Sequence, residues 1–158
     1  LPHLRMGGYE RDPLAQRIAE RNLKRLGVWD RFCWLGEDYL SPRLTPLSAD
    51  LWVANPPYLD PQRSEMESTP RVRQTEPPGA LWAPTRDGVC DPTGVYRDWL
   101  AQARSDTQAH ATYAVEVPHE RAEAIGQVIE ALFGARETLR WSELRDLRGE
   151  VRAIRWTR

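Results

Sequence analysis

Apolar residues recur at helical spacing in several segments of the chain. After Asp12 and Pro13, leucine and isoleucine residues fall close to one helical face until Gly27, a pattern typical of a capped helix. A second helix is predicted over residues 96–103. The clearest amphipathic pattern spans residues 120–133, where the apolar positions are Ala124, Ile125, Val128, Ile129 and Leu132.

Short apolar or alternating runs between these segments predict strands over residues 4–10, 31–35, 51–54, 111–117, 138–141 and 151–156. The run at 51–54 is apolar at consecutive positions, which is typical of a central parallel strand. A polar loop is expected over residues 36–48. Strands that alternate with helices favour an open α/β sheet, in which ligands bind beyond the carboxyl ends of the strands.

Residues 59–92 are rich in proline and follow neither the helical nor the strand period. A loop of this length in a compact domain is usually functional or disordered. We interpret it as a Pro-rich loop on the substrate side of one domain that spans residues 1–158. A disordered segment is the alternative.

Composition narrows the classes of function. The chain has 158 residues, of which 41% are hydrophobic, and its net charge of −1 provides no general attraction to nucleic acid. Cys33 and Cys90 lack metal-ligand spacing and the histidines form no motif, so no metal site is predicted. No apolar run reaches the length of a membrane span, and no signal-peptide pattern begins the chain. We therefore expect a cytoplasmic protein without a membrane partner, and nucleic acid is disfavoured as a partner.

The tetrapeptide Asn55-Pro56-Pro57-Tyr58, directly after the apolar run, carries the most chemical information. An amide or arylamine nitrogen is a poor nucleophile because its lone pair is delocalised. The Asn55 side-chain carbonyl and the Pro56 backbone carbonyl, held by fixed φ angles, can accept its two N–H groups and so orient the lone pair. Tyr58 offers a flat face for a planar group. The alternative is an ordinary Pro-rich turn.

Two acidic residues follow the earlier predicted strands. Glu10 ends the strand at 4–10, where a carboxylate can accept both ribose hydroxyls of a nucleotide, as in dinucleotide-binding folds. Asp38 lies just after the next strand and could accept a hydrogen bond from an adenine amino group. Because Glu10 and Asn55 both fall at carboxyl ends of strands, we expect them to share one site. The alternative for both acids is a solvated position without a ligand.

Further stretches add to the tetrapeptide, at residues 8–15, 19–22, 76–81, 87–88, 96–97, 116 and 146–152. Together they resemble the S-adenosylmethionine-dependent amino-methyltransferases, and most closely the protein-(glutamine) methyltransferases of the HemK/PrmC type. The resemblance runs over essentially the whole chain. The tetrapeptide alone is moderately specific, whereas its combination with the segment at 76–81 and the tail at 146–152 is more specific.

The resemblance implies an α/β fold with the Rossmann-like sheet of class I methyltransferases. It implies S-adenosylmethionine as cofactor and methylation of the glutamine amide in the Gly-Gly-Gln loop of a peptide chain release factor. On this basis Glu10 binds the cofactor ribose, Asp38 approaches the adenine, and Asn55 lies at both the cofactor and the substrate. The resemblance also assigns catalytic roles to Asn55, Pro56 and Tyr58, and substrate contacts to these residues, Pro57 and Glu76.

The sequence also departs from the family pattern. The chain begins at what would be the second strand, so the first strand and the Gly-rich loop that holds the methionine end of the cofactor are expected to be missing. Pro118 stands where the family has glycine, and Arg121 or its neighbours replace a glutamine. We therefore expect an N-terminally incomplete catalytic domain. Two alternatives stay open: an amino-methyltransferase that acts on a flipped nucleobase, and a non-catalytic remnant of a methyltransferase.

Overall fold

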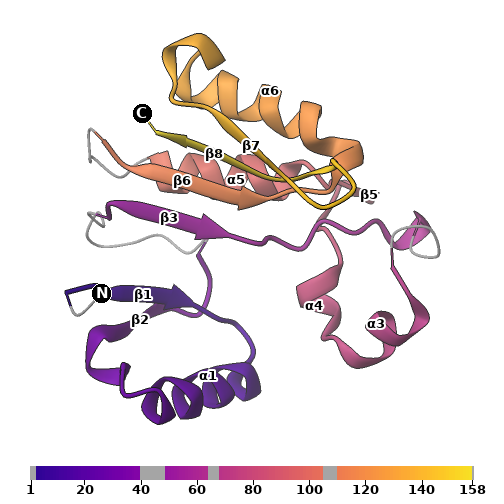
Figure 1. Ribbon diagram of the computed structural model, residues 1–158. Coiled ribbons are helices and arrows are strands. Elements are labelled where there is room, and N and C mark those ends of the chain that lie inside the picture. Colours follow the sequence, from indigo (N-terminus) through magenta and orange to yellow (C-terminus); the bar gives the residue numbers. More distant parts are fainter. Residues whose placement is uncertain (1–2, 40–48, 64–67, 105–109, 158) are drawn as a thin grey trace. The chain divides into compact units, whose positions relative to one another are not determined.

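A computed structural model of the chain describes residues 3–39, 49–63, 68–104 and 110–157. The chain divides into two compact units, Leu1–Leu44 and Thr45–Arg158. Figure 1 shows the elements of both units, and each unit is described by itself below.

The first unit is a strand–helix–strand motif. It contains β1 (Met6–Tyr9), α1 (Pro13–Arg25), the short helix η1 (Trp29–Arg31) and β2 (Phe32–Gly36), with β1 and β2 paired in parallel. Asp12 caps α1, because its Oδ1 accepts hydrogen bonds from the backbone N–H of Leu14 at 2.7 Å and of Ala15 at 3.0 Å. The helix start predicted from the Asp-Pro pair is confirmed.

The second unit is built on a four-stranded sheet with the order β3-β6-β8-β7. Its strands are β3 (Leu51–Ala54), β6 (Thr112–Glu116), β7 (Ser142–Arg145) and β8 (Val151–Thr157). β3 and β6 are parallel, while β8 is antiparallel to both β6 and β7. The helices α5 (Gly94–Arg104) and α6 (Ala122–Phe133) contact each other, and α6 also contacts β8. The short helices η3 (His119–Arg121) and η4 (Arg136–Thr138) flank α6.

The core of this unit is aromatic where α6 meets the sheet. Trp156 is completely buried, and its ring stacks on that of Tyr113 with 5.1 Å between centroids. Phe133, the last residue of α6, packs edge-on against Trp156 at 5.4 Å. Ile125 and Ile129 of α6 are also fully buried, which confirms the amphipathic helix predicted over this segment.

Two strand predictions need correction. β3 is parallel to β6, as predicted, but it is an edge strand of the four-stranded sheet and not a central one. Its residues Leu51 and Val53 are 56% and 69% exposed. No strand covers residues 138–141. Arg140 already exchanges backbone hydrogen bonds of 3.2 and 3.3 Å with Thr157 of β8, but β7 begins at Ser142, and the Thr138 hydroxyl donates to the Ala135 carbonyl at 2.7 Å. A side chain that bonds the local backbone in this way competes with strand pairing.

The Pro-rich segment over residues 59–92 is more ordered than an irregular loop. Its described part forms η2 (Pro61–Arg63), α3 (Pro70–Thr75), α4 (Pro78–Leu81) and the hairpin of β4 (Thr85–Arg86) with β5 (Val89–Cys90). Proline begins both α3 and α4, where its fixed φ angle favours a first helical turn. The sequence shows no helical period here because α3 has only 6 residues and α4 only 4, and the substrate-side role of the segment stays a prediction. Residues 64–67, and residues 40–48 of the predicted polar loop, lie outside the described residues.

We expect the interior of the second unit to dominate stability. Replacing Ile129 with alanine should lower the free energy of unfolding by about 2–5 kcal/mol, because a cavity replaces buried methyl groups. Leu147→Ala is the matched control, since that side chain is fully exposed, and should change the value by about 0.5 kcal/mol or less. Urea unfolding followed by tryptophan fluorescence measures both, and equal losses would contradict the assigned core.

Candidate functional site

The Asn55–Tyr58 tetrapeptide leaves the sheet at the carboxyl end of β3. Ala54, the last residue of β3, is level with Val115 of β6 in the parallel register, so the tetrapeptide begins beside Glu116 at the same edge. The structure thus places Asn55 in a loop beyond a strand end, as the sequence predicts, and outside any helix.

Packing and backbone pairing hold this loop in place. Pro56 is buried, and Pro57 and Tyr58 are half-buried. Directly afterwards, the Leu59 N–H donates to the Leu81 carbonyl at 3.0 Å, and the Ala83 N–H donates to the Leu59 carbonyl at 2.9 Å. The end of α4 is therefore bonded to the residue that follows Tyr58, and the Pro-rich segment forms a wall beside the tetrapeptide.

A hollow of about 360 Å³ lies between the tetrapeptide and this wall. One side is formed by residues 55–59, and the other by residues of the Pro-rich segment, namely Ser68, Thr69, Val72, Ala80 and Leu81. Asn55 is exposed, and in the described part of the chain its side chain makes no hydrogen bond. No described protein group therefore occupies the side-chain amide, which is open to a ligand. Glu76 is exposed at the C-cap of α3 and does not line the hollow.

Tyr58 is tied to the neighbouring strand by its hydroxyl. The hydroxyl donates to Oε1 of Glu116 at 3.4 Å, and the backbone carbonyl of Glu116 accepts the Tyr96 hydroxyl at 2.9 Å. Burial raises the pKa of Tyr58 above its usual value, and the charge of Glu116 and its hydrogen bond raise it further. Burial likewise raises the pKa of Tyr96. Both hydroxyls are therefore neutral donors at neutral pH.

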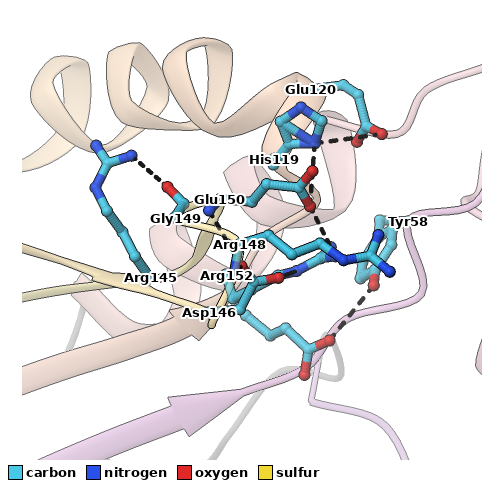
Figure 2. A network of polar contacts seen from close by, with 10 residues as sticks. Tyr58, His119, Glu120, Arg145, Asp146, Arg148, Gly149, Glu150 and Arg152 are labelled. Carbon is cyan, nitrogen blue, oxygen red and sulfur yellow. Dashed lines mark hydrogen bonds and ion pairs between the residues drawn. The ribbon is translucent and has the colours of Figure 1, made fainter.

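Figure 2 shows a charged network in the β7–β8 hairpin, and the positive charge of Arg152 in this network acts on the Tyr58 hydroxyl. The Arg152 guanidinium bonds Oδ2 of Asp146 at 3.0 Å and Oε2 of Glu150 at 3.1 Å, and Nδ1 of His119 lies 3.9 Å from the same Glu150 oxygen. The hydrogen bond from Arg152 lowers the pKa of Asp146 below its usual value. The antiparallel register of β8 with β6 brings this hairpin to the carboxyl edge at which Asn55 lies.

The first unit carries the acidic residues predicted to bind a nucleotide. Glu10 and Asp38 follow β1 and β2, whose parallel pairing puts both at one edge, and Arg11 lies 3.7 Å from Asp38. The Glu10 carboxylate accepts the Asp12 N–H at 2.9 Å, and Gln16 donates to the Glu10 carbonyl at 2.6 Å. Glu10 also borders a hollow of about 410 Å³ between α1 and the strands. That Glu10 and Asn55 share one site stays a prediction.

The described residues contain no cluster of metal-ligand side chains and no helix suited to cross a membrane. Among these residues, no three histidine, cysteine, aspartate or glutamate side chains are grouped as metal ligands. Within the same part of the chain, no helix combines the length and apolar character that a bilayer crossing requires.

Sequence reasoning missed most of the surroundings of Tyr58. In the sequence, Glu116 was noted only as part of the family resemblance. It lies at the carboxyl end of a strand, as Glu10 does, and this position is a signal that could have identified it. Tyr96 lies on the buried face of α5, where an aromatic residue at helical spacing indicates core packing. The hollow's second wall could not be read from the sequence, because α3 and α4 are too short to show a period.

Comparison with known proteins supports the resemblance noted from the sequence. The chain is 30% identical over 132 residues to a release factor glutamine methyltransferase from Moorella thermoacetica, a match that covers 84% of this chain and 44% of that protein. It is 37% identical over 98 residues to a release factor glutamine methyltransferase from Geobacter sulfurreducens, covering 61% of this chain and 31% of that protein. The chain thus spans less than half the length of these relatives. No protein-family model matches it.

Solved structures identify the fold. SMU.1697c from Streptococcus mutans, named as a methyltransferase and solved in complex with SAH, superposes with a TM-score of 0.55 at 9% identity, over 97% of this chain and 75% of that one. The fold is that of the class I S-adenosylmethionine-dependent methyltransferases, as the sequence predicts.

We expect Tyr58 to titrate above the usual tyrosine pKa of 10.0 in the folded protein. Burial and the adjacent carboxylate both disfavour the phenolate, so the group should remain protonated through neutral pH. ¹³C NMR of protein labelled at the tyrosine ring, with the signal assigned through Tyr58→Phe, measures the pKa directly. The urea-unfolded protein is the control, and a folded value at or below the unfolded one would contradict the geometry.

Proposed function

We propose that this chain, a sequence relative of the release factor glutamine methyltransferases with the fold of class I methyltransferases, carries the methyl-transfer site of such an enzyme. The reaction moves the methyl group of S-adenosylmethionine to the side-chain amide nitrogen of a glutamine in a peptide chain release factor. The observation that carries the proposal is the hollow at the carboxyl end of β3, which is formed by Asn55-Pro56-Pro57-Tyr58. Its position fits the edge at which such sheets bind ligands.

The tetrapeptide suits a weakly nucleophilic nitrogen. The Asn55 side-chain carbonyl and the Pro56 backbone carbonyl accept the two N–H groups of the glutamine amide, and Pro57 limits the motion of the loop. With both N–H groups held, the lone pair points to the electrophile. With S-adenosylmethionine bound, a nitrogen held by Asn55 and Pro56 would take the methyl group from sulfur, S-adenosylhomocysteine would leave, and the nitrogen would then release one proton to solvent. Positioning and electrostatic preorganisation supply the rate enhancement.

Tyr58 supplies a wall for the planar amide. Tyr58 is one of the residues that line the hollow, and its raised pKa keeps the hydroxyl neutral at the pH of the reaction. A neutral phenol ring is a flat, largely apolar surface on which an amide can lie. Glu76 does not line the hollow. If it contacts the substrate, it contacts a part of the release factor loop other than the glutamine side chain.

S-adenosylmethionine supplies the electrophilic methyl group, and the first unit has the residues to bind its nucleoside. The carboxylates of Glu10 and Asp38 lie beyond the ends of adjacent parallel strands, and Glu10 is half-buried beside a hollow. Carboxylate oxygens are suitable acceptors for ribose hydroxyls and for an adenine amino group. We assign ribose binding to Glu10, an adenine contact to Asp38, and a contact with both ligands to Asn55.

We predict that Asn55→Ala in the full-length protein lowers turnover about a hundredfold to a thousandfold, or roughly 2.7–4 kcal/mol, because one preorganised acceptor is lost. Cofactor affinity should change far less. Asn55→Asp should retain part of the activity, since a carboxylate oxygen still accepts the N–H. Gln127→Ala, which removes an exposed amide from α6, is the matched control.

The assay offers S-adenosylmethionine with a labelled methyl group to release factor, to release factor whose loop glutamine is replaced by alanine, and to nucleic acid. Label in the first sample alone supports the proposal. Label in nucleic acid alone would replace it by the base-methylating alternative, and no transfer to any substrate would favour the non-catalytic one. Full activity of Asn55→Ala would refute the amide-orienting mechanism.

We predict that Glu10→Ala weakens S-adenosylmethionine binding tenfold or more. A carboxylate that accepts two hydroxyl groups makes charge-assisted hydrogen bonds, each worth about 1.5–3 kcal/mol. Asp30→Ala is the control, since Asp30 is an exposed acid of η1, just before β2 and so at the opposite end of that strand. Isothermal titration calorimetry gives the affinities, and an unchanged value in folded Glu10→Ala protein would remove this residue from the site.

A further inference from the structure

Glu116 has a fixed backbone and a side chain at the carboxyl edge of the sheet. It is the last residue of β6, a strand paired with β3 on one side and with β8 on the other. Its backbone carbonyl accepts a hydrogen bond from Tyr96, which is completely buried in α5. The exposed Glu116 carboxylate therefore projects from a position that two strands and a helix hold in place.

We infer that Glu116 is a positioning residue, whose carboxylate accepts the Tyr58 hydroxyl and thereby fixes the ring of a residue that lines the hollow at Asn55. Tyr58 follows two prolines in a loop, so its backbone alone does not set the direction of its ring. The hydroxyl at the far end of the side chain has a single proton to donate, and the Glu116 oxygen is its acceptor. A side chain held at both ends keeps one orientation.

The charges around Tyr58 favour the same arrangement. Glu116, Glu120 and Arg152 are the charged groups that act on its hydroxyl, the two carboxylates raising its pKa and the guanidinium lowering it. Arg152 is itself held by Asp146 and Glu150 of the β7–β8 hairpin (Figure 2). The hydroxyl thus lies near a restrained cation, and its proton is directed to the Glu116 carboxylate.

This role rests on the proposed function, since a fixed ring matters for turnover only if the substrate amide lies against it. The competing role for Glu116 is direct contact with the substrate, which its exposure permits. The two roles differ in one respect: a residue that acts through Tyr58 has no effect once the Tyr58 hydroxyl is removed.

The test uses the full-length protein and a double-mutant cycle of Glu116→Ala and Tyr58→Phe. Each single variant should lower kcat for release factor methylation by roughly tenfold to a hundredfold, because the ring is misplaced, while the KM for S-adenosylmethionine stays unchanged. The double variant should be no slower than the slower single variant. Glu116→Gln keeps an acceptor oxygen and should recover most of the lost rate. Glu137→Ala, which changes an exposed acid of η4, is the control.

A second readout requires no substrate. In Glu116→Ala the Tyr58 pKa, measured by ¹³C NMR, should fall toward 10.0, because a carboxylate that raises it has been removed. An unchanged pKa overturns the inference, and so does an unchanged kcat. A further tenfold loss from Glu116→Ala in the Tyr58→Phe background assigns Glu116 to the substrate and also overturns it. If the wild-type protein does not methylate release factor, the proposed function fails by itself, and the pKa alone then decides whether Glu116 holds Tyr58.

Discussion

The parallel pairing of β3 with β6 is the interaction on which the candidate site depends. It sets Ala54 level with Val115, and so brings the residues that follow both strands to one edge of the sheet. A shift of one residue would turn every β3 side chain to the opposite face. The antiparallel pairing of β8 with β6 then adds the β7–β8 hairpin to the same edge. Backbone hydrogen bonds inside the sheet thus assemble groups that are far apart in sequence.

The side chains at this edge support each other in a definite order. Tyr96 anchors the end of β6 from the buried face of α5, Glu116 at that end accepts the Tyr58 hydroxyl, and the Arg152 guanidinium is restrained nearby. The part-buried bond from Tyr96 is shielded from solvent on the side of α5, whereas the exposed charges of the hairpin are screened and contribute less to stability. We therefore infer that the main effect of the hairpin network is to set the charge around the Tyr58 hydroxyl, and that its contribution to stability is small.

The sequence was informative where local chemistry decides structure. The Asp12-Pro13 cap, the amphipathic helix before Phe133 and the apolar run of β3 were all predicted, because each depends on neighbouring residues or on a regular period. The position of Asn55 beyond a strand end followed from the same reasoning. The wall formed by α3 and α4, and the bond between Tyr58 and Glu116, depend on contacts between distant segments. No spacing rule reveals such contacts, so the structure was needed to find them.

The central claim is that the hollow at Asn55 holds a glutamine amide of a release factor for methylation. The most direct test is tandem mass spectrometry of release factor after incubation with the full-length protein and S-adenosylmethionine, because fragment ions locate the modified residue. The account predicts a single added methyl group on the side-chain amide of one loop glutamine. A methyl group on any other side chain, or an unmodified release factor beside methylated nucleic acid, would contradict it.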